Sequence, residues 1–159
     1  MGKNISVAKF YCLHVTSPWP ITLVKTHGPS MLPTIDLMNV FLGERIPTRF
    51  GKVALARGDI IVLRSPRNPR KFIVKRLVGM EGDSITYNSR TQKTNKHTTV
   101  LVPKGHVWVQ GDNIYNSKDS THFGPVPYGH IQRRIFWRVW PLEKFGPFWK
   151  KHLKLSTMR

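Results

Sequence analysis

Ser30 and Lys75 are the two residues of this sequence that could carry out a chemical step together, with the serine as nucleophile. Ser30 follows Gly28 and Pro29, which make a tight turn, and it precedes the apolar Met31. Glycine permits a close approach of substrate, and the backbone N–H of Ser30 can point at an oxyanion. Taken alone, this segment is more typical of an ordinary turn, where serine, glycine and proline are common.

Lys75 interrupts the otherwise apolar segment 72–78, FIVKRLV. Because side chains alternate along a strand, Lys75 shares a face with Ile73 and Leu77, and Arg76 points the other way. Apolar surroundings disfavour the charged form of a lysine and lower its pKa, and a neutral amine can take a proton from a serine hydroxyl. Taken alone, the segment favours a plainer interpretation, an edge-strand lysine that prevents aggregation.

The third segment of interest, 111–126, is dense in turn-forming and hydroxyl residues. Such a loop can bring Ser117, Asp119 and Ser120 close to a neighbouring strand. Ser117 could hydrogen-bond and orient a neutral lysine, and Asp119 could pair with Arg76. The alternative is a long loop built from local Asx and serine turns.

The elements around these segments are predicted to be β-strands. Short apolar runs alternate with turn signals, of which Gly58-Asp59, Gly82-Asp83 and Gly111-Asp112 are the clearest. Residues 88–98 are polar and predict an exposed loop, and 141–151 could hold a short helix. The expected strands cover 40–42, 60–63, 72–78, 84–87, 98–102, 106–110 and 131–139.

The composition predicts a folded chain with a polyanionic neighbour. The 159 residues are 40% hydrophobic and carry 26 Lys and Arg against 8 Asp and Glu, a net charge of +18. A nucleic acid or an anionic membrane surface would attract such a chain. The single cysteine, Cys12, excludes an intrachain disulfide, and the scattered histidines predict no metal site and no cofactor.

The amino terminus predicts an attachment to a membrane or a targeting signal. Residues 5–24 are apolar overall, but Lys9, His14, Pro18 and Pro20 interrupt them, so they fall short of a regular transmembrane helix. An interfacial anchor, a short targeting segment or a simple arm would fit this pattern. We therefore divide the chain into an anchor or targeting segment at 1–27, a catalytic domain at 28–146 and a basic tail at 147–159.

Four boxes, in order and with suitable spacing, resemble those of type I signal peptidases, and most of all the subunit 1 type of the mitochondrial inner membrane peptidase. The resemblance covers about residues 28–146, which is most of the chain. The boxes are Ser30-Met31-x-Pro33-Thr34; Gly58 to Val62 with Ser65-Pro66; Lys75 to Asp83; and Gly111-Asp112-Asn113 with Asn116-Ser117-x-Asp119-Ser120 and Phe123 to Val126.

The resemblance implies a mainly β catalytic domain of coiled antiparallel sheets with a Ser–Lys dyad. Carried onto this sequence, Ser30 is the nucleophile and Lys75 its general base. Ser117 lies beside the lysine, Asp119 pairs with Arg76, and the turn 28–31 binds substrate and oxyanion. No metal or cofactor takes part.

The resemblance also implies a biological setting. The substrates are precursor proteins with hydrophobic sorting presequences, and the enzyme faces the intermembrane space from the mitochondrial inner membrane. It works with a second peptidase subunit. We interpret the basic excess as facing an anionic membrane, with Trp137, Trp140, Trp149, Phe145 and Phe148 at the lipid interface or in the core.

Two departures from the family pattern leave alternatives open. Gly28 stands where bacterial members often have a serine that donates to the oxyanion, and Thr121-His122 follow Asp119-Ser120 where an arginine is usual. A catalytically impaired subunit is therefore one alternative. A basic β module that binds nucleic acid is another, although no RNP-type, zinc-knuckle or helix-turn-helix motif supports it. A self-cleaving repressor would need a DNA-binding domain, for which residues 1–27 are too short.

Overall fold

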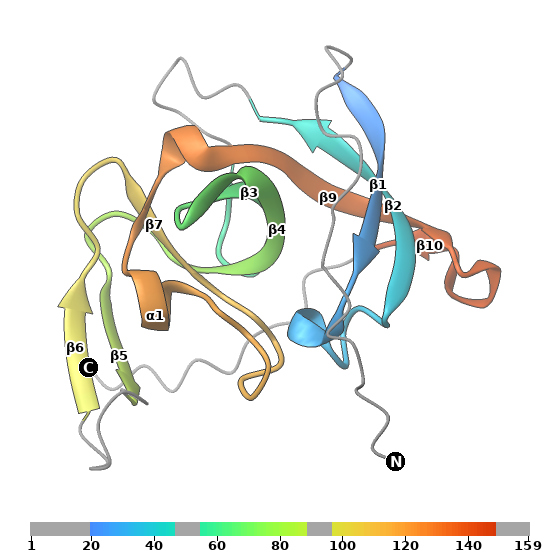
Figure 1. The fold of residues 1–159 in the computed structure, drawn as a ribbon. Coiled ribbons are helices and arrows are strands. Elements are labelled where there is room, and N and C mark those ends of the chain that lie inside the picture. Colours follow the sequence, from blue (N-terminus) through green and yellow to red (C-terminus); the bar gives the residue numbers. More distant parts are fainter. Residues whose placement is uncertain (1–19, 47–54, 89–96, 149–159) are drawn as a thin grey trace, which may run out of the picture.

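The computed structural model describes residues 20–46, 55–88 and 97–148. Eight strands of these residues form one antiparallel sheet, with the path β1-β2-β9-β3-β4-β7-β8 and with β10 paired to β9. Figure 1 shows that this sheet coils, so that β3 and β4 lie at its centre. The strands are β1 (Ile21–His27), β2 (Met38–Arg45), β3 (Ile60–Ser65), β4 (Asn68–Gly79), β7 (His106–Gln110), β8 (Val126–Pro127), β9 (Ile131–Trp140) and β10 (Gly146–Pro147).

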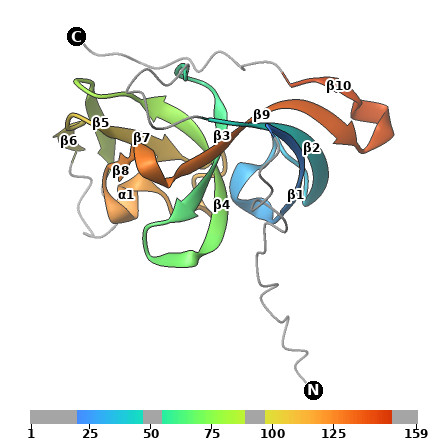
Figure 2. The same ribbon diagram turned by 90° about the horizontal axis from the view of Figure 1, so that it is seen from above.

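A separate two-stranded sheet consists of β5 (Ser84–Asn88) and β6 (His97–Leu101). Figure 2 shows it beside β7, at the end of the molecule opposite β10. Its partly buried side chains, such as Ile85 and Val100, pack against a small core cluster that includes Val78 and Trp108. The ribbon is therefore tied to the main sheet by apolar contacts.

The apolar run of β3 explains why the sheet coils around it. Ile61 and Leu63 belong to one core cluster, whereas Ile60 and Val62 belong to a second cluster on the opposite face. All four side chains are almost completely buried. Four successive apolar residues in a strand are stabilised only when both faces of the strand are covered, as the curled sheet and the turn at Met31 cover them here.

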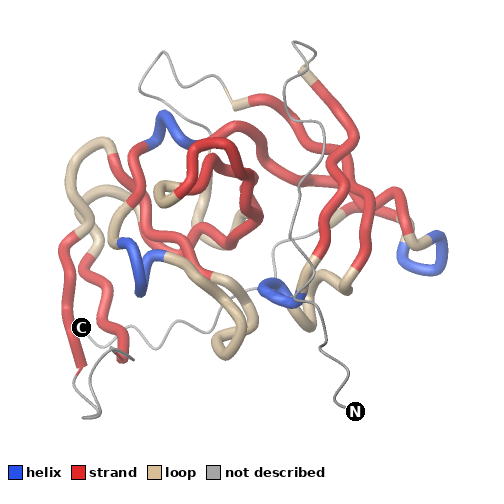
Figure 3. The backbone as a smooth tube through the Cα atoms, viewed as in Figure 1, coloured by secondary structure: helices blue, strands red, loops and turns tan. Residues whose placement is uncertain are grey.

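The seven predicted strands are confirmed, each within a few residues of its expected ends, and the mainly β fold is confirmed with them. Figure 3 shows that the helices of the described residues are short turns between strands. The short helix expected within 141–151 is a 3-10 turn, η4 (Leu142–Lys144), and residues 149–151 lie outside the described part. The loop expected at 88–98 also lies mostly outside it, at 89–96.

Both predicted boundaries of the catalytic domain need correction. The segment Ile21–His27 is not part of an anchor: it is strand β1, paired with β2 along its whole length, and Val24 is completely buried. At the other end, Pro147 pairs with β9, and the ring centroid of Phe148 lies 5.0 Å from that of Phe41. The folded unit therefore begins by residue 21 and extends at least to Phe148.

The interpretation of 5–24 as an anchor falls largely on residues 1–19, which lie outside the described part. Within the ranges that are described, no helix has the length and apolar character needed to cross a bilayer.

Candidate active site

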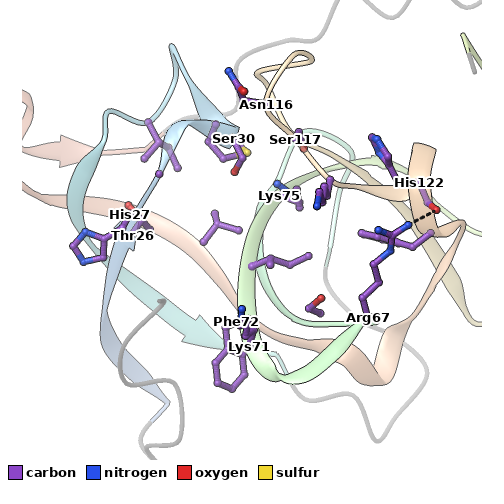
Figure 4. A pocket seen from close by; sticks show the side chains of 18 of the residues that line it. Thr26, His27, Ser30, Arg67, Lys71, Phe72, Lys75, Asn116, Ser117 and His122 are labelled. Carbon is purple, nitrogen blue, oxygen red and sulfur yellow. Dashed lines mark hydrogen bonds between the residues drawn. The ribbon is translucent and has the colours of Figure 1, made fainter. Parts of the chain in front are cut away.

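A cleft of about 710 Å³ lies between the β1 side of the sheet and β4, and both Ser30 and Lys75 line it. Figure 4 shows their side chains together with that of Ser117, which comes from the loop after β7. Three segments far apart in the sequence therefore meet at this cleft. Gly28 and Met31 also line it, whereas Pro29 is not among its lining residues.

Ser30 occupies a 3-10 turn, η1 (Pro29–Met31), that directly follows β1. Gly28 precedes the turn with φ 114°, a conformation that favours glycine, and its N–H donates to the Leu37 carbonyl at 3.1 Å. Met31 is buried in the core cluster below. The Ser30 carbonyl accepts from the Asn113 N–H at 3.1 Å. The serine is thus fixed from both sides, by the core and by the loop after β7.

Lys75 is buried in the middle of the sheet, with only 3% of its surface exposed. Its strand β4 lies between β3 and β7, so the alternative of an edge-strand lysine is wrong. Ile73 and Leu77, two positions away on either side, belong to or pack against the same core cluster. Burial lowers the pKa of Lys75 to about 8, and the carboxylates of Asp119 and Asp112 act in the opposite direction.

The loop after β7 places a hydroxyl and a carboxylate next to this lysine's cleft. The Ser117 hydroxyl donates to Asp119 Oδ2 at 2.7 Å, and both side chains are buried. Burial alone would raise the pKa of Asp119, but hydrogen bonds from the Gly111 N–H, from Ser117 and from Thr121 outweigh it and hold the pKa below its ordinary value. Asp119 is therefore a carboxylate at neutral pH.

The predicted ion pair between Asp119 and Arg76 is wrong. Arg76 is buried, and its guanidinium donates to Asp112 with Nε to Oδ1 at 2.7 Å and Nη2 to Oδ2 at 2.5 Å. It also donates to the Gly58 carbonyl at 2.9 Å. The register explains the change: Arg76 is paired with Gln110, the last residue of β7, and Asp112 follows only two residues later. Arg76 therefore fastens the start of the loop after β7.

Chemically, the arrangement supplies a nucleophile, a lysine with a lowered pKa and a polar support behind it. Among the described residues no hydrogen bond joins Ser30 Oγ to Lys75 Nζ, and such bonds often close only when substrate is bound. The described residues hold no cluster of three His, Cys, Asp or Glu side chains that could bind a metal ion.

Sequence reasoning did not identify Gly111, Asp112 and Thr121 as parts of the site. Gly111 and Asp112 were interpreted as a turn, and Thr121 as a departure from the family pattern. Gly111 is buried against Ser117 and the Ser30 carbonyl and has no positive φ, so its role is close packing. Its position directly after an apolar strand was the available signal, because a glycine there permits close backbone approach.

The comparisons with known proteins agree with this geometry. Residues 5–96 and 88–140 match the family described as "Signal peptidase, peptidase S26". The mitochondrial ATP-independent inner membrane protease subunit 1a of Arabidopsis thaliana is 51% identical over 147 residues, covering 91% of this chain and 86% of that protein. The mitochondrial inner membrane protease subunit 1 of Homo sapiens is 44% identical over 124 residues, covering 78% and 72%.

Two further similarities extend the comparison. The mitochondrial inner membrane protease subunit 2 of Saccharomyces cerevisiae is 35% identical over 144 residues, covering 87% of this chain and 77% of that protein. A crystal structure of a signal peptidase I from Enterococcus faecalis matches with a TM-score of 0.43 and 26% identity, covering 50% of this chain and 95% of that chain. Since the sequence match spans most of the chain, this protein belongs to the signal peptidase family, peptidase S26, and is a serine protease of that type.

Proposed function

We propose that this chain is a membrane-associated serine endopeptidase that removes hydrophobic sorting presequences from proteins delivered to the mitochondrial intermembrane space. The observation that supports this best is the cleft, because both the nucleophile candidate Ser30 and the almost completely buried Lys75 line it. A lysine is rarely buried without a carboxylate in direct contact unless its amine has a task.

In the proposed mechanism, neutral Lys75 takes the proton of the Ser30 hydroxyl, and Ser30 Oγ attacks the carbonyl of an extended substrate strand. The oxyanion is stabilised by backbone N–H groups of the turn at Ser30, because the first N–H groups of a helix have no partner within it. Lys75 then returns the proton to the leaving amine. Water finally hydrolyses the acyl-enzyme.

Ser117, Asp119 and Arg76 act as supports in this proposal. Because Ser117 donates its hydrogen to Asp119, the lone pairs of its hydroxyl oxygen can accept a hydrogen bond from the amine of Lys75. Asp119 holds Ser117 in that orientation. Arg76, through Asp112, holds the loop that carries both residues against β4.

The proposed setting is the face of the mitochondrial inner membrane toward the intermembrane space. Relatives of this chain include proteins named subunit 1 and subunit 2 of the mitochondrial inner membrane protease, and the match to subunit 1 proteins extends to 51% identity. We therefore propose a second peptidase subunit as a partner, in addition to the precursor substrates.

The test is processing of a presequence-bearing precursor by the full chain and by Ser30→Ala and Lys75→Ala variants. Each variant should lose at least about a thousandfold in kcat/KM, because each removes one half of the dyad. The exposed Ser84 and Lys104 provide matched controls: Ser84→Ala and Lys104→Ala should cleave like the unaltered chain. Activity should also rise with pH through about 8, as Lys75 loses its proton.

Full activity in Ser30→Ala or Lys75→Ala would contradict the dyad. A flat pH dependence below pH 8 would contradict a neutral lysine as the base. Absence of cleavage by the unaltered chain, even together with a second peptidase subunit, would instead favour the alternative of a catalytically impaired subunit.

A further inference from the structure

The carboxylate of Asp119 is held at both of its oxygens, and the two oxygens have different partners. Oδ2 accepts from the Ser117 hydroxyl at 2.7 Å and from the Gly111 N–H at 3.0 Å. Oδ1 accepts from the Thr121 hydroxyl at 2.7 Å and from the Thr121 N–H at 3.2 Å. Oδ2 therefore holds Gly111 and Ser117 of the loop after β7, and Oδ1 is held by Thr121.

The direction of the Thr121 hydroxyl bond follows from its neighbours. An ionised carboxylate has no hydrogen to donate, so the single hydroxyl hydrogen of Thr121 points at Asp119. Thr121 Oγ1 also lies 3.0 Å from His122 Nδ1, and with its hydrogen already used it must accept there, so Nδ1 carries the proton. The chain of donation runs from His122 to Thr121 to Asp119.

Asp119 matters to the reaction because its charge acts on Lys75, whose pKa it raises against the effect of burial. Among the described side chains, no lysine or arginine forms an ion pair with Asp119, and His122 Nδ1 lies 3.8 Å from Oδ1. The orientation of the Asp119 carboxylate is thus fixed by neutral hydrogen-bond donors. The carboxylates of Asp119 and Asp112 both act on Lys75 of β4, and His122 of α1 (Ser120–Phe123) is the titratable side chain beside Asp119.

We propose that Thr121 is a positioning residue for the Ser–Lys dyad. Its hydroxyl holds Oδ1 of Asp119, so that the carboxylate supports Ser117 and does not form a direct ion pair with Lys75. This inference rests on the proposed function. Without the hydroxyl, the carboxylate can turn toward the buried ammonium, which stabilises the protonated lysine and removes the base. A cationic donor at the same position should have the opposite effect, since it offsets the charge of Asp119.

The experiment compares Thr121→Val, Thr121→Arg and Thr121→Ser in the full chain, with kcat/KM for a presequence-bearing precursor measured across the neutral and alkaline range. Thr121→Val should lower kcat/KM about tenfold at neutral pH and move the acid limb up by about one pH unit. Thr121→Arg should move the limb down, and Thr121→Ser should restore the profile of the unaltered chain. Thr86→Val is the matched control, because it removes the exposed Thr86–Thr99 hydroxyl contact of 2.9 Å in the separate ribbon.

If Thr121 only supports Asp119 as the N-cap of the short helix α1, Thr121→Val will lower the melting temperature but leave the acid limb in place, and the inference is overturned. It is also overturned if valine and arginine move the limb in the same direction. Should the valine variant fail to fold, the other two decide: a lower limb for arginine with an unchanged limb for serine supports the inference, and no shift for arginine overturns it. Failure of the proposed function is distinct, because either the unaltered chain would then not cleave the precursor or cleavage would persist in Ser30→Ala.

Discussion

At the scale of single residues, Lys75 shows how burial makes a reactive group. Lys75 is only 3% exposed among aliphatic side chains, and this burial disfavours its charged form. Its pKa is therefore lowered to about 8 from the ordinary value of 10.5. The same burial that makes a neutral amine accessible near physiological pH also makes the charged form unfavourable in the fold. Function and stability therefore conflict at this position.

We expect Lys75→Met to inactivate the protease and to stabilise it. At pH 7 the folded and unfolded chains both carry the proton, so the fold contains a buried charge that methionine would remove; the gain is at most about 3 kcal/mol from the pKa difference. The unaltered chain should gain stability as pH rises between about 8 and 10.5, where only the folded lysine has lost its proton. Denaturant unfolding followed by tryptophan fluorescence measures both effects.

The control for this prediction is the exposed Lys104→Met, which should change the free energy of unfolding little at any pH. The advantage of Lys75→Met should shrink toward alkaline pH, because the buried amine of the unaltered chain is then neutral as well. A methionine variant that is less stable than the unaltered chain at pH 7 would contradict the account of Lys75 as a destabilising buried charge.

The sequence alone was enough to select Lys75 as a candidate base, but it did not identify the partner of Arg76. A single lysine within FIVKRLV is recognisable because it breaks an apolar run. The partner of Arg76 depends on the register between β4 and β7, which sets Gln110 opposite Arg76 and brings Asp112 within reach. Register is a property of two strands together, so no pattern in either segment alone could choose between Asp112 and Asp119.

At the scale of elements, the loop after β7 and the turn that carries Ser30 are packed backbone to backbone. The Asn113 N–H donates to the Ser30 carbonyl. A Cβ atom added at Gly111 would lie 2.5 Å from that same carbonyl oxygen and would overlap the Ser117 hydroxyl. Since real Cβ contacts are not that short, the glycine allows the two segments to approach each other.

Gly111→Ala should therefore separate Ser30 from Ser117 and reduce kcat/KM by about a hundredfold, because a displacement of about 1 Å is costly in a site built on position. Gly129→Ala is the matched control, since a Cβ there meets no atom within 4 Å, and it should retain full activity. The measurement is precursor cleavage, with a thermal melt to confirm that both variants fold. Wild-type kcat/KM in Gly111→Ala would show that the close packing has no catalytic role.

The strands that could be predicted from the sequence are those that have a recognisable turn signal beside them. Gly58 and Gly82 take positive φ values at the turns where their Gly-Asp pairs predicted them. Strand β1 was missed because its first residues, ITLV, belong to the apolar run 5–24, and such a run is equally consistent with an anchor. Its alternation of exposed and buried side chains becomes meaningful only beside β2.

At the scale of the whole molecule, two properties point to contact with a membrane surface. The net charge of +18 attracts the chain to anionic lipid at about 1 kcal/mol for each cation near the surface. In addition, large apolar side chains are exposed around η4 and the end of β9, namely Trp140 at 51%, Leu142 at 65% and Phe145 at 59%. Figure 2 shows that this turn, next to β10, projects at one end of the molecule.

We expect the full chain to sediment with vesicles that contain about a third phosphatidylserine and to bind pure phosphatidylcholine far less, with binding that falls as salt screens the charges. Apolar insertion does not depend on salt, so some binding should remain at high salt, and the double variant Trp140→Ser, Phe145→Ser should lose that remainder. Thr86→Ser and Thr99→Ser, exposed on the separate ribbon, form the matched control. Equal high-salt binding of the double variant and the control would show that Trp140 and Phe145 do not insert into lipid. Salt-independent binding of every variant would contradict the role of the basic excess.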